Sequence, residues 1–429
     1  METSIEEELF EILVEDPDAS GGLGEKEQAA EPGNFLRHAG ALSLSKMADG
    51  LIDPKLVLSW LVTHLGAGAG IAGLLVPVRE AGALLPQLFT AARIHAMARR
   101  KWAWAAGAAG QGIAAGGIAL AGLTLEGAAA GWVIVALLGL LALSRSVCSV
   151  AFKDVLGKTV GKTRRGTVTG AASSVSAAAV LVFAGVLIAG WGDRYAIVIG
   201  AVALAAGFWL LAGAIFATLT EIASDTEPPK NTLGEALGQL SLLRDRPQLV
   251  RFITARSLLV GTALAPPYLV VLAQEAGESG LSNLGVLVLA SSGASLLSSF
   301  VWGRMADRSS RRVLMLAGVA SALALLAALA ARALGLAGTV WAVPVVLFGL
   351  MIAYHGVRNG RSTYLVDMAP EDERAAYTAV SNTVVGVVLL VAGGLSAAVA
   401  SVGVGWVIAL YAALSVVGAV VAYGLKEVE

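Results

Sequence analysis

Charge, cysteine and histidine are all scarce in this sequence. Asp, Glu, Lys and Arg make up 14% of its 429 residues, whereas about a quarter of a soluble domain is charged. A single cysteine, Cys148, excludes a disulfide framework, and the four scattered histidines do not complete a structural zinc site. We therefore expect no metal and no cofactor. The composition excludes an ordinary cytosolic enzyme.

The charge that is present is distributed unevenly. Residues 1–34 contain eleven acids and one base, Lys26, so this tail carries −10; because the net charge is −1, the remainder carries +9. The basic residues are dispersed among apolar spans and form no continuous patch, which excludes a nucleic-acid binder. We expect residues 1–34 to be an acidic, disordered cytoplasmic tail, with a short amphipathic stretch at Ile5, Leu9, Phe10 and Leu13.

Apolar residues make up 57% of the chain, and the mean hydropathy is +0.76. A bilayer core needs about 20 apolar residues per helix, and helix-length apolar runs recur along the chain without the strand alternation of a membrane barrel. The sequence predicts an all-α membrane protein with twelve transmembrane helices. The expected spans are 38–63, 69–91, 103–124, 128–150, 168–190, 195–218, 250–274, 281–302, 313–334, 339–357, 376–399 and 403–424.

Lysine and arginine predict the orientation, because they are enriched in cytoplasmic loops. They gather in alternate loops, at 93–101, 153–165, 230–246 and 304–312, whereas the opposite loops contain only Arg194 and Arg332. Both termini are therefore expected in the cytoplasm, in a multi-pass protein of the plasma (inner) membrane. The acidic first 34 residues have no basic n-region, so we expect no cleavable signal peptide.

The two halves of the sequence resemble each other. Residues 48–57 align with 261–270 at an offset of 213, and 91–100 align with 303–312 at an offset of 212. Parallel six-helix repeats are a known transporter plan. We expect two pseudo-symmetric six-helix bundles, residues 35–220 and 249–425, joined by a cytoplasmic linker at 221–248.

The loop at 303–312 reads Gly-Arg-Met-Ala-Asp-Arg-Ser-Ser-Arg-Arg. It resembles the signature loop of the major facilitator superfamily, G-x-x-x-D-R-x-x-R-R, and the resemblance extends over about residues 35 to 424. The resemblance implies a secondary transporter working by alternating access. The loop would then form a cytoplasmic gate, whose residues are Gly303, Asp307, Arg308, Arg311 and Arg312. In the first copy His95 replaces the acid, so the gating charge either sits chiefly in the second half or is supplied by Glu80.

A charged group at membrane depth is costly, and each one is a candidate functional residue. Lys46, Asp49 and Asp53 share one face of the first span at 100° per residue, whereas Lys55 is predicted to point away. Pro54 interrupts this span, and Pro267 holds the matching place in the second half. Interruptions at corresponding positions of two repeats indicate a transporter's central site.

Further charges complete the predicted substrate and proton-coupling cavity. Arg79 and Glu80 lie near the centre of the second span, where a buried structural ion-pair network is the alternative to a cavity role. Arg145 occupies the region where several families of the superfamily keep an arginine linked to proton coupling, but its surroundings depart from their motif. Arg256 and His355 are the candidates from the second half, although a histidine such as His355 is more often a packed hydrogen-bonding group.

Tyr354 and Arg358 add to the polar side chains of the second half, and Arg358 and Arg361 are equally explained as charges that set the topology. Because the candidates include more cations than anions, an anionic or zwitterionic solute is weakly favoured. We predict a proton-coupled secondary transporter of a small organic solute, acting as a monomer in the lipid bilayer. The alternative is a transporter-like membrane protein that serves as a sensor or assembly factor.

Overall fold

The computed structural model describes residues 5–14, 22–224, 234, 238–277, 284–370 and 373–428. Residues 1–4 and 15–21 of the predicted tail, and 225–233 and 235–237 of the predicted linker, lie outside these ranges. Within the described residues, all regular structure is helical. This confirms the all-α fold class.

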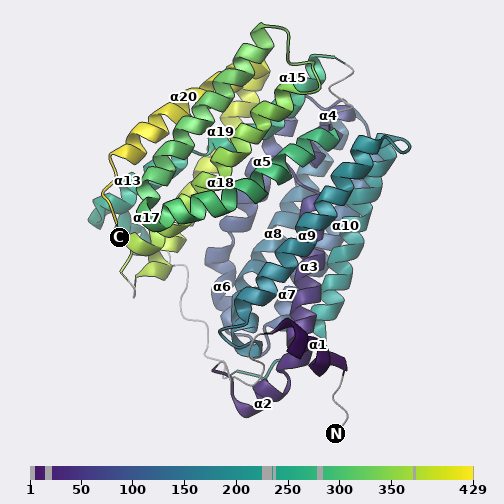
Figure 1. Cartoon of the computed structure of the whole chain (residues 1–429), viewed down its shortest axis with the longest axis vertical. Helices are drawn as coiled ribbons and strands as arrows, with labels where there is room; N and C mark the ends of the chain where they lie inside the picture. Colours follow the sequence, from purple (N-terminus) through teal and green to yellow (C-terminus); the bar gives the residue numbers. More distant parts are fainter. Residues whose placement is uncertain are drawn as a thin grey trace.

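The first half of the chain forms one bundle (Figure 1). Its helices are α3 (Glu31–Leu51), α4 (Val57–His64), α5 (Ala69–Leu84), α6 (Gln87–His95), α7 (Lys101–Thr124), α8 (Gly127–Thr159), α9 (Arg165–Ala189) and α10 (Arg194–Ala217).

The second half forms the other bundle. Its helices are α13 (Pro247–Leu258), α14 (Gly261–Leu264), α15 (Pro266–Glu275), α17 (Leu284–Ala333), α18 (Ala342–Met368), α19 (Arg374–Ala400) and α20 (Val404–Tyr423). Before α13 come a 3-10 turn at Gln239–Ser241 and the short helix α12 (Leu242–Asp245).

The helices have the length and the apolar surface of membrane spans. In the described part of the chain, nine helical segments are long and apolar enough to cross a bilayer, and Leu284–Ser298 is a shorter apolar segment. Large apolar side chains such as Leu123, Leu323 and Val420 are more than 60% exposed, as expected where lipid replaces water. The chain is a membrane protein. The count of twelve spans stays a prediction.

Two predicted spans are interrupted in the middle. α3 ends at Leu51, and α4 begins only at Val57. Between them Pro54 has no N–H to donate, while its carbonyl accepts a hydrogen bond from the Ser59 hydroxyl at 2.7 Å. In the second half α13, α14 and α15 divide the corresponding segment, and α15 starts at Pro266. α17 also contains a break, at Ser309, where φ is −168° and ψ is 96°.

The two bundles contact each other along α5 and α19, along α9 and α17, and at one end where α15 lies against α4 and α5. Figure 1 shows the bundles close together at the α4–α15 end and apart at the end where the termini lie. Small residues allow the α5–α19 approach: a Cβ at Gly393 would collide with the Pro77 ring, and one at Gly70 would lie 2.9 Å from the Ala397 carbonyl oxygen.

The acidic tail contains regular structure where the sequence analysis expected disorder. Helix α1 (Ile5–Leu13) covers the amphipathic stretch, and α2 (Glu25–Ala29) precedes α3. Phe10 is only 4% exposed, and its ring meets the Phe35 ring edge-on at 5.3 Å between centroids. The buried Glu31 carboxylate pairs with the Arg164 guanidinium and accepts the Gly161 N–H. These contacts join the tail to the ends of α3, α8 and α9.

Candidate functional site

A cavity of about 640 Å³ lies between the two bundles. Its walls come from α3, α5, α8 and α9 of the first half and from α17 and α18 of the second. The two bundles contact each other through α4 and α15 at one end and are apart at the end where the termini lie (Figure 1).

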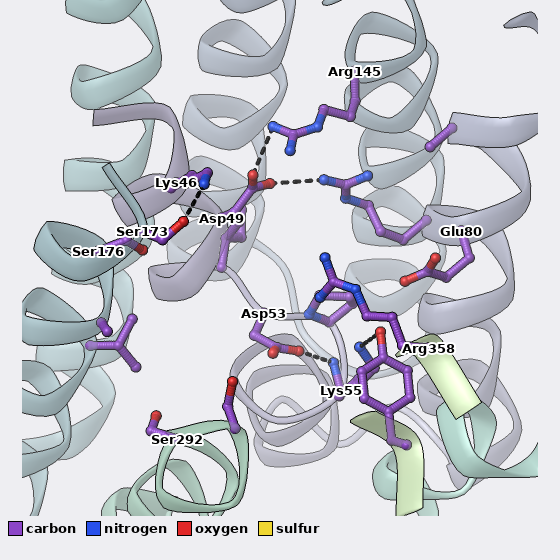
Figure 2. A pocket seen from close by; sticks show the side chains of 18 of the residues that line it. Lys46, Asp49, Asp53, Lys55, Glu80, Arg145, Ser173, Ser176, Ser292 and Arg358 are labelled. Carbon is purple, nitrogen blue, oxygen red and sulfur yellow. Dashed lines mark hydrogen bonds and ion pairs between the residues drawn. The ribbon is translucent and has the colours of Figure 1, made fainter. Parts of the chain in front are cut away.

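Asp49 is the centre of a charge cluster in this cavity. Its two carboxylate oxygens pair with different arginines, Arg79 at 2.8 Å and Arg145 at 2.7 Å. All three side chains are partly exposed to the cavity, between 14% and 31%. The helices α3, α5 and α8 thus meet through one carboxylate shared by two guanidinium groups, as Figure 2 shows.

Lys46 lies one turn before Asp49 and points to α9 instead. Its ammonium group donates to the Thr169 carbonyl oxygen at 3.1 Å and to the Ser173 hydroxyl. All four predicted residues therefore line the same cavity. Asp49, Arg79 and Arg145 form ion pairs with one another, whereas Lys46 binds residues of α9.

The interruption of the first span places Asp53 and Lys55 together. The Asp53 carboxylate accepts the backbone N–H of Lys55 at 2.6 Å. The Lys55 ammonium group lies 3.3 Å from the Tyr354 hydroxyl and 4.3 Å from the centre of that ring. Since Tyr354 belongs to α18, this contact connects the two halves of the chain.

The prediction that Lys55 points away from the other charges is wrong. It assumed a continuous helix, whereas the helix ends at Leu51, and a rotation of 100° per residue does not apply to the turn at 53–56. Lys55 is buried and lines the cavity.

Glu80 points into the cavity from α5 (Figure 2). Four cations lie within electrostatic reach of its carboxylate: Lys55 and Arg79 from the first half, and Arg358 and Arg361 from the second. Arg358 and Arg361 line the cavity, so these two side chains are cavity residues whatever they contribute to topology. Their i, i+3 spacing puts them on one face of α18, which is the sequence signal for their common location.

The two candidates predicted from the second half, Arg256 and His355, are not among the residues that line the main cavity. Arg256 is 5% exposed and donates to the Ser381 hydroxyl at 2.8 Å and to the Asn382 side-chain oxygen at 3.1 Å. It lines a smaller cavity of about 40 Å³, which Glu80 also lines. His355 is not among the lining residues of either cavity; its ring packs edge-on against Tyr354.

The predicted gate residues lie around the break in α17, away from the cavity lining. Asp307 and Arg308 are exposed. The Arg311 guanidinium pairs with Glu427 at 2.7 Å and donates to the Tyr423 carbonyl oxygen at 3.1 Å. The hydroxyl of Ser309 donates to the Glu427 carboxylate, and this hydrogen bond, together with Arg311, lowers the pKa of Glu427.

The other two predicted gate residues are Arg312 and Gly303. The backbone N–H of Arg312 donates to the Ser309 hydroxyl at 3.2 Å, and a Cβ at Gly303 would meet nothing within 4 Å. In this conformation the loop is therefore tied to the chain's own C-terminal segment.

The corresponding loop of the first half contacts acids from elsewhere in the chain. Asp154 of α8 pairs with Arg100 at 2.9 Å and lies 3.1 Å from the His95 ring nitrogen. Glu221 accepts the backbone N–H groups of Arg100 and Lys101 at 3.0 and 2.8 Å. Glu80, the other acid considered for this loop, lines the cavity.

The family model of the Major Facilitator Superfamily matches residues 39–355 and 252–429. The chain therefore belongs to this superfamily, and it is a membrane transporter by family and not an enzyme. No curated protein sequence matches the chain.

Several solved transporters share the fold. A mutant form of the nucleoside transporter NupG superposes with a TM-score of 0.68 at 13% identity, over 91% of this chain and 99% of that chain. A D-xylose-proton symporter gives 0.65 at 13% identity, over 92% and 97% of the two chains. The xylose transporter XylE from E. coli, in an inward open conformation, gives 0.63 at 14% identity over 92% and 96%. At these identities the likeness concerns the fold.

Proposed function

We propose that this protein is a proton-coupled secondary transporter that moves a small, anionic or zwitterionic organic solute by alternating access. The observation that carries the proposal is the cavity between the two halves, lined by three acids and six bases. Intramembrane charges that line a cavity mark solute and proton pathways. Neighbouring folds include a D-xylose-proton symporter, which supports proton coupling without establishing it.

Glu80 is the candidate proton carrier. A proton on Asp49 would break two ion pairs, at 2.7 and 2.8 Å, and Asp53 is engaged with the backbone of Lys55. Glu80 instead faces cations from both halves, whose distances change when the halves move relative to each other. Its affinity for a proton would then differ between the two states, as coupling requires.

The protein acts as a monomer in the plasma (inner) membrane, with both termini in the cytoplasm, so this conformation is open to the inside. Asp307, Arg308, Arg311 and Arg312 close the cavity on that side in the opposite state. The charge distribution of the loops supports this orientation.

The proposal is tested in liposomes that contain a trapped pH-sensitive dye. We expect at least one solute from a panel of organic acids, amino acids and sugars to drive proton movement across the membrane. Glu80→Gln should abolish the proton movement while the solute still binds, because a neutral amide keeps the approximate shape of the carboxyl group and has no proton to exchange. Glu126→Gln is the matched control, since Glu126 lies outside the cavity lining, and it should behave as the unmodified protein.

The alternative function, a sensor or assembly factor, predicts a different result. Such a protein would bind solutes or partners without moving solute or protons. Solute binding in a thermal-shift screen, combined with no transport of any bound solute, would favour this alternative.

A further inference from the structure

We propose that the solute is an anionic polyol, meaning a small molecule with a carboxylate or phosphate group and several hydroxyl groups. The proposal rests on the proposed transport function and specifies its substrate class. It follows from the cavity's charge, its hydroxyl groups and the arrangement of the two.

The charge of the cavity is positive. The lining cations are Lys46, Lys55, Arg79, Arg145, Arg358 and Arg361, and the lining acids are Asp49, Asp53 and Glu80. Six positive and three negative groups leave an excess of three positive charges. A neutral solute would leave this excess uncompensated at membrane depth, where charge is costly.

The positive charge is divided between two groups of lining side chains. Asp49 offsets part of the charge of Arg79 and Arg145 through direct ion pairs. Near the α18 wall, Glu80 and Asp53 offset part of the charge of Lys55, Arg358 and Arg361. Arg358 is exposed to the cavity and extends between Glu80 and Asp53 (Figure 2). This wall is the place for the anionic group, because guanidinium groups bind carboxylates and phosphates with paired hydrogen bonds.

Hydroxyl groups line the opposite wall. Ser173 and Ser176 come from α9, and Ser292 and Ser295 come from α17. Figure 2 shows Ser173, Ser176 and Ser292 across the cavity from Glu80 and Arg358. A serine hydroxyl both donates and accepts hydrogen bonds, as does each hydroxyl of a polyol, so these groups complement each other.

The lining does not favour an aromatic solute. Among the described lining residues, Tyr354 is the one aromatic side chain, and its ring already contacts Lys55. The volume of about 640 Å³ falls in the range of small-molecule pockets, about 300–1,000 Å³. An acyclic or cyclic six-carbon acid or phosphate fits this space.

The test uses four probes on the full-length protein in detergent: gluconate, glucose 6-phosphate, glucose and hexanoate. Isothermal titration at one pH gives their dissociation constants. We expect gluconate or glucose 6-phosphate to bind at least about tenfold more tightly than glucose, which lacks the charge, and hexanoate, which lacks the hydroxyls. The tighter of the two anions identifies the carboxylate or the phosphate as the anionic group.

Matched variants locate the two parts of the site. Arg358→Gln should raise the dissociation constant of the charged polyol about tenfold or more. Arg251→Gln, on the exposed side of α13, should leave this constant unchanged. Ser176→Ala should weaken binding of the charged polyol and leave binding of hexanoate unchanged. Ser174→Ala, on the same helix but outside the lining, should not affect the binding of either probe.

Three results would overturn the inference. Equal binding of glucose and gluconate would remove the role of charge, and equal binding of hexanoate would remove the role of the hydroxyls. No binding of either charged polyol would reject the substrate class. The transport assay separates these results from the proposed function. Proton-coupled movement of a different solute would support the transport function and reject the anionic polyol as its substrate. Binding of a charged polyol without transport would support the ligand class and reject the transport function.

Discussion

Asp49 stabilises three helices through one carboxylate. Its oxygens bind Arg79 and Arg145 separately, so both guanidinium groups depend on the same acid. Removing a shared partner therefore has a larger effect than removing either base, because it leaves two like charges facing each other.

Asp49→Asn is expected to lower the stability of the protein by about 1–3 kcal/mol, since the cluster is only partly exposed. Arg145→Gln should cost less than about 1 kcal/mol, because the pair between Asp49 and Arg79 remains. Thermal unfolding in detergent measures both. Equal losses in the two variants would contradict the shared role of Asp49.

Glu80 and Lys55 differ from Asp49 because their surroundings involve both halves of the chain. Glu80 faces Arg358 and Arg361 of α18, and Lys55 contacts Tyr354 of the same helix. These side chains therefore change surroundings whenever the halves move, whereas the Asp49 cluster moves as a unit with the first bundle.

Helix α1 docks on the first bundle through the Phe10 ring and through an ion pair between Glu6 and Arg37 at 3.2 Å. Phe10 packs against Phe35, and the Arg164 guanidinium lies 5.2 Å from the Phe10 ring. A nine-residue helix is too short to be stable alone in water. Its order therefore depends on these docking contacts.

Phe10→Ala should release α1 and increase amide hydrogen exchange at residues 5–14, because a buried Phe→Ala change costs about 3–5 kcal/mol. The unfolding temperature of the bundles should change little. Ile12→Ala is the matched control: Ile12 is 79% exposed on the same helix, so its replacement should leave exchange unchanged. An unaltered exchange rate in the Phe10 variant would mean that other contacts hold the helix.

The interrupted helices have a common cause in both halves. Proline at 54 and at 266–267 removes backbone donors near the centre of the first helix of each half. In the first half this break turns Lys55 toward the cavity. The breaks thus supply side chains to the cavity that a continuous helix would direct elsewhere.

The arrangement of the two bundles determines access to the cavity. They meet through α4 and α15 at one end and separate at the other. Glycines let the backbones of α5 and α19 approach closely along this contact. The proposed transport cycle alternates this conformation with one closed at the end that bears the termini.

Cysteine labelling tests the direction of the opening. Cys148 is only 4% exposed, so the unmodified protein should react poorly with a membrane-impermeant maleimide. Ser176→Cys, in the cavity, should react in inside-out vesicles several times faster than in right-side-out vesicles. Val402→Cys, 75% exposed in the turn between α19 and α20, should show the reverse preference. Faster labelling of Ser176→Cys from the outside would contradict an inward opening.

The sequence by itself determined the class of fold, because helix-length apolar runs need only a count of residues against the thickness of a bilayer. It also identified Asp49, Arg79, Arg145 and Glu80, since charge at membrane depth is conspicuous in any sequence. The acids that contact the first loop, Asp154 and Glu221, could not be predicted. They come from distant positions that only packing brings together.

The tertiary structure decided which charges face each other. A helical projection is valid only within one uninterrupted helix, so it failed for Lys55, beyond the break at Pro54. The contact between Lys55 and Tyr354 joins residues 299 positions apart, and no local pattern encodes such a distance. Periodicity and charge therefore revealed the elements and their candidate residues, whereas the cavity depends on how two separately formed bundles meet.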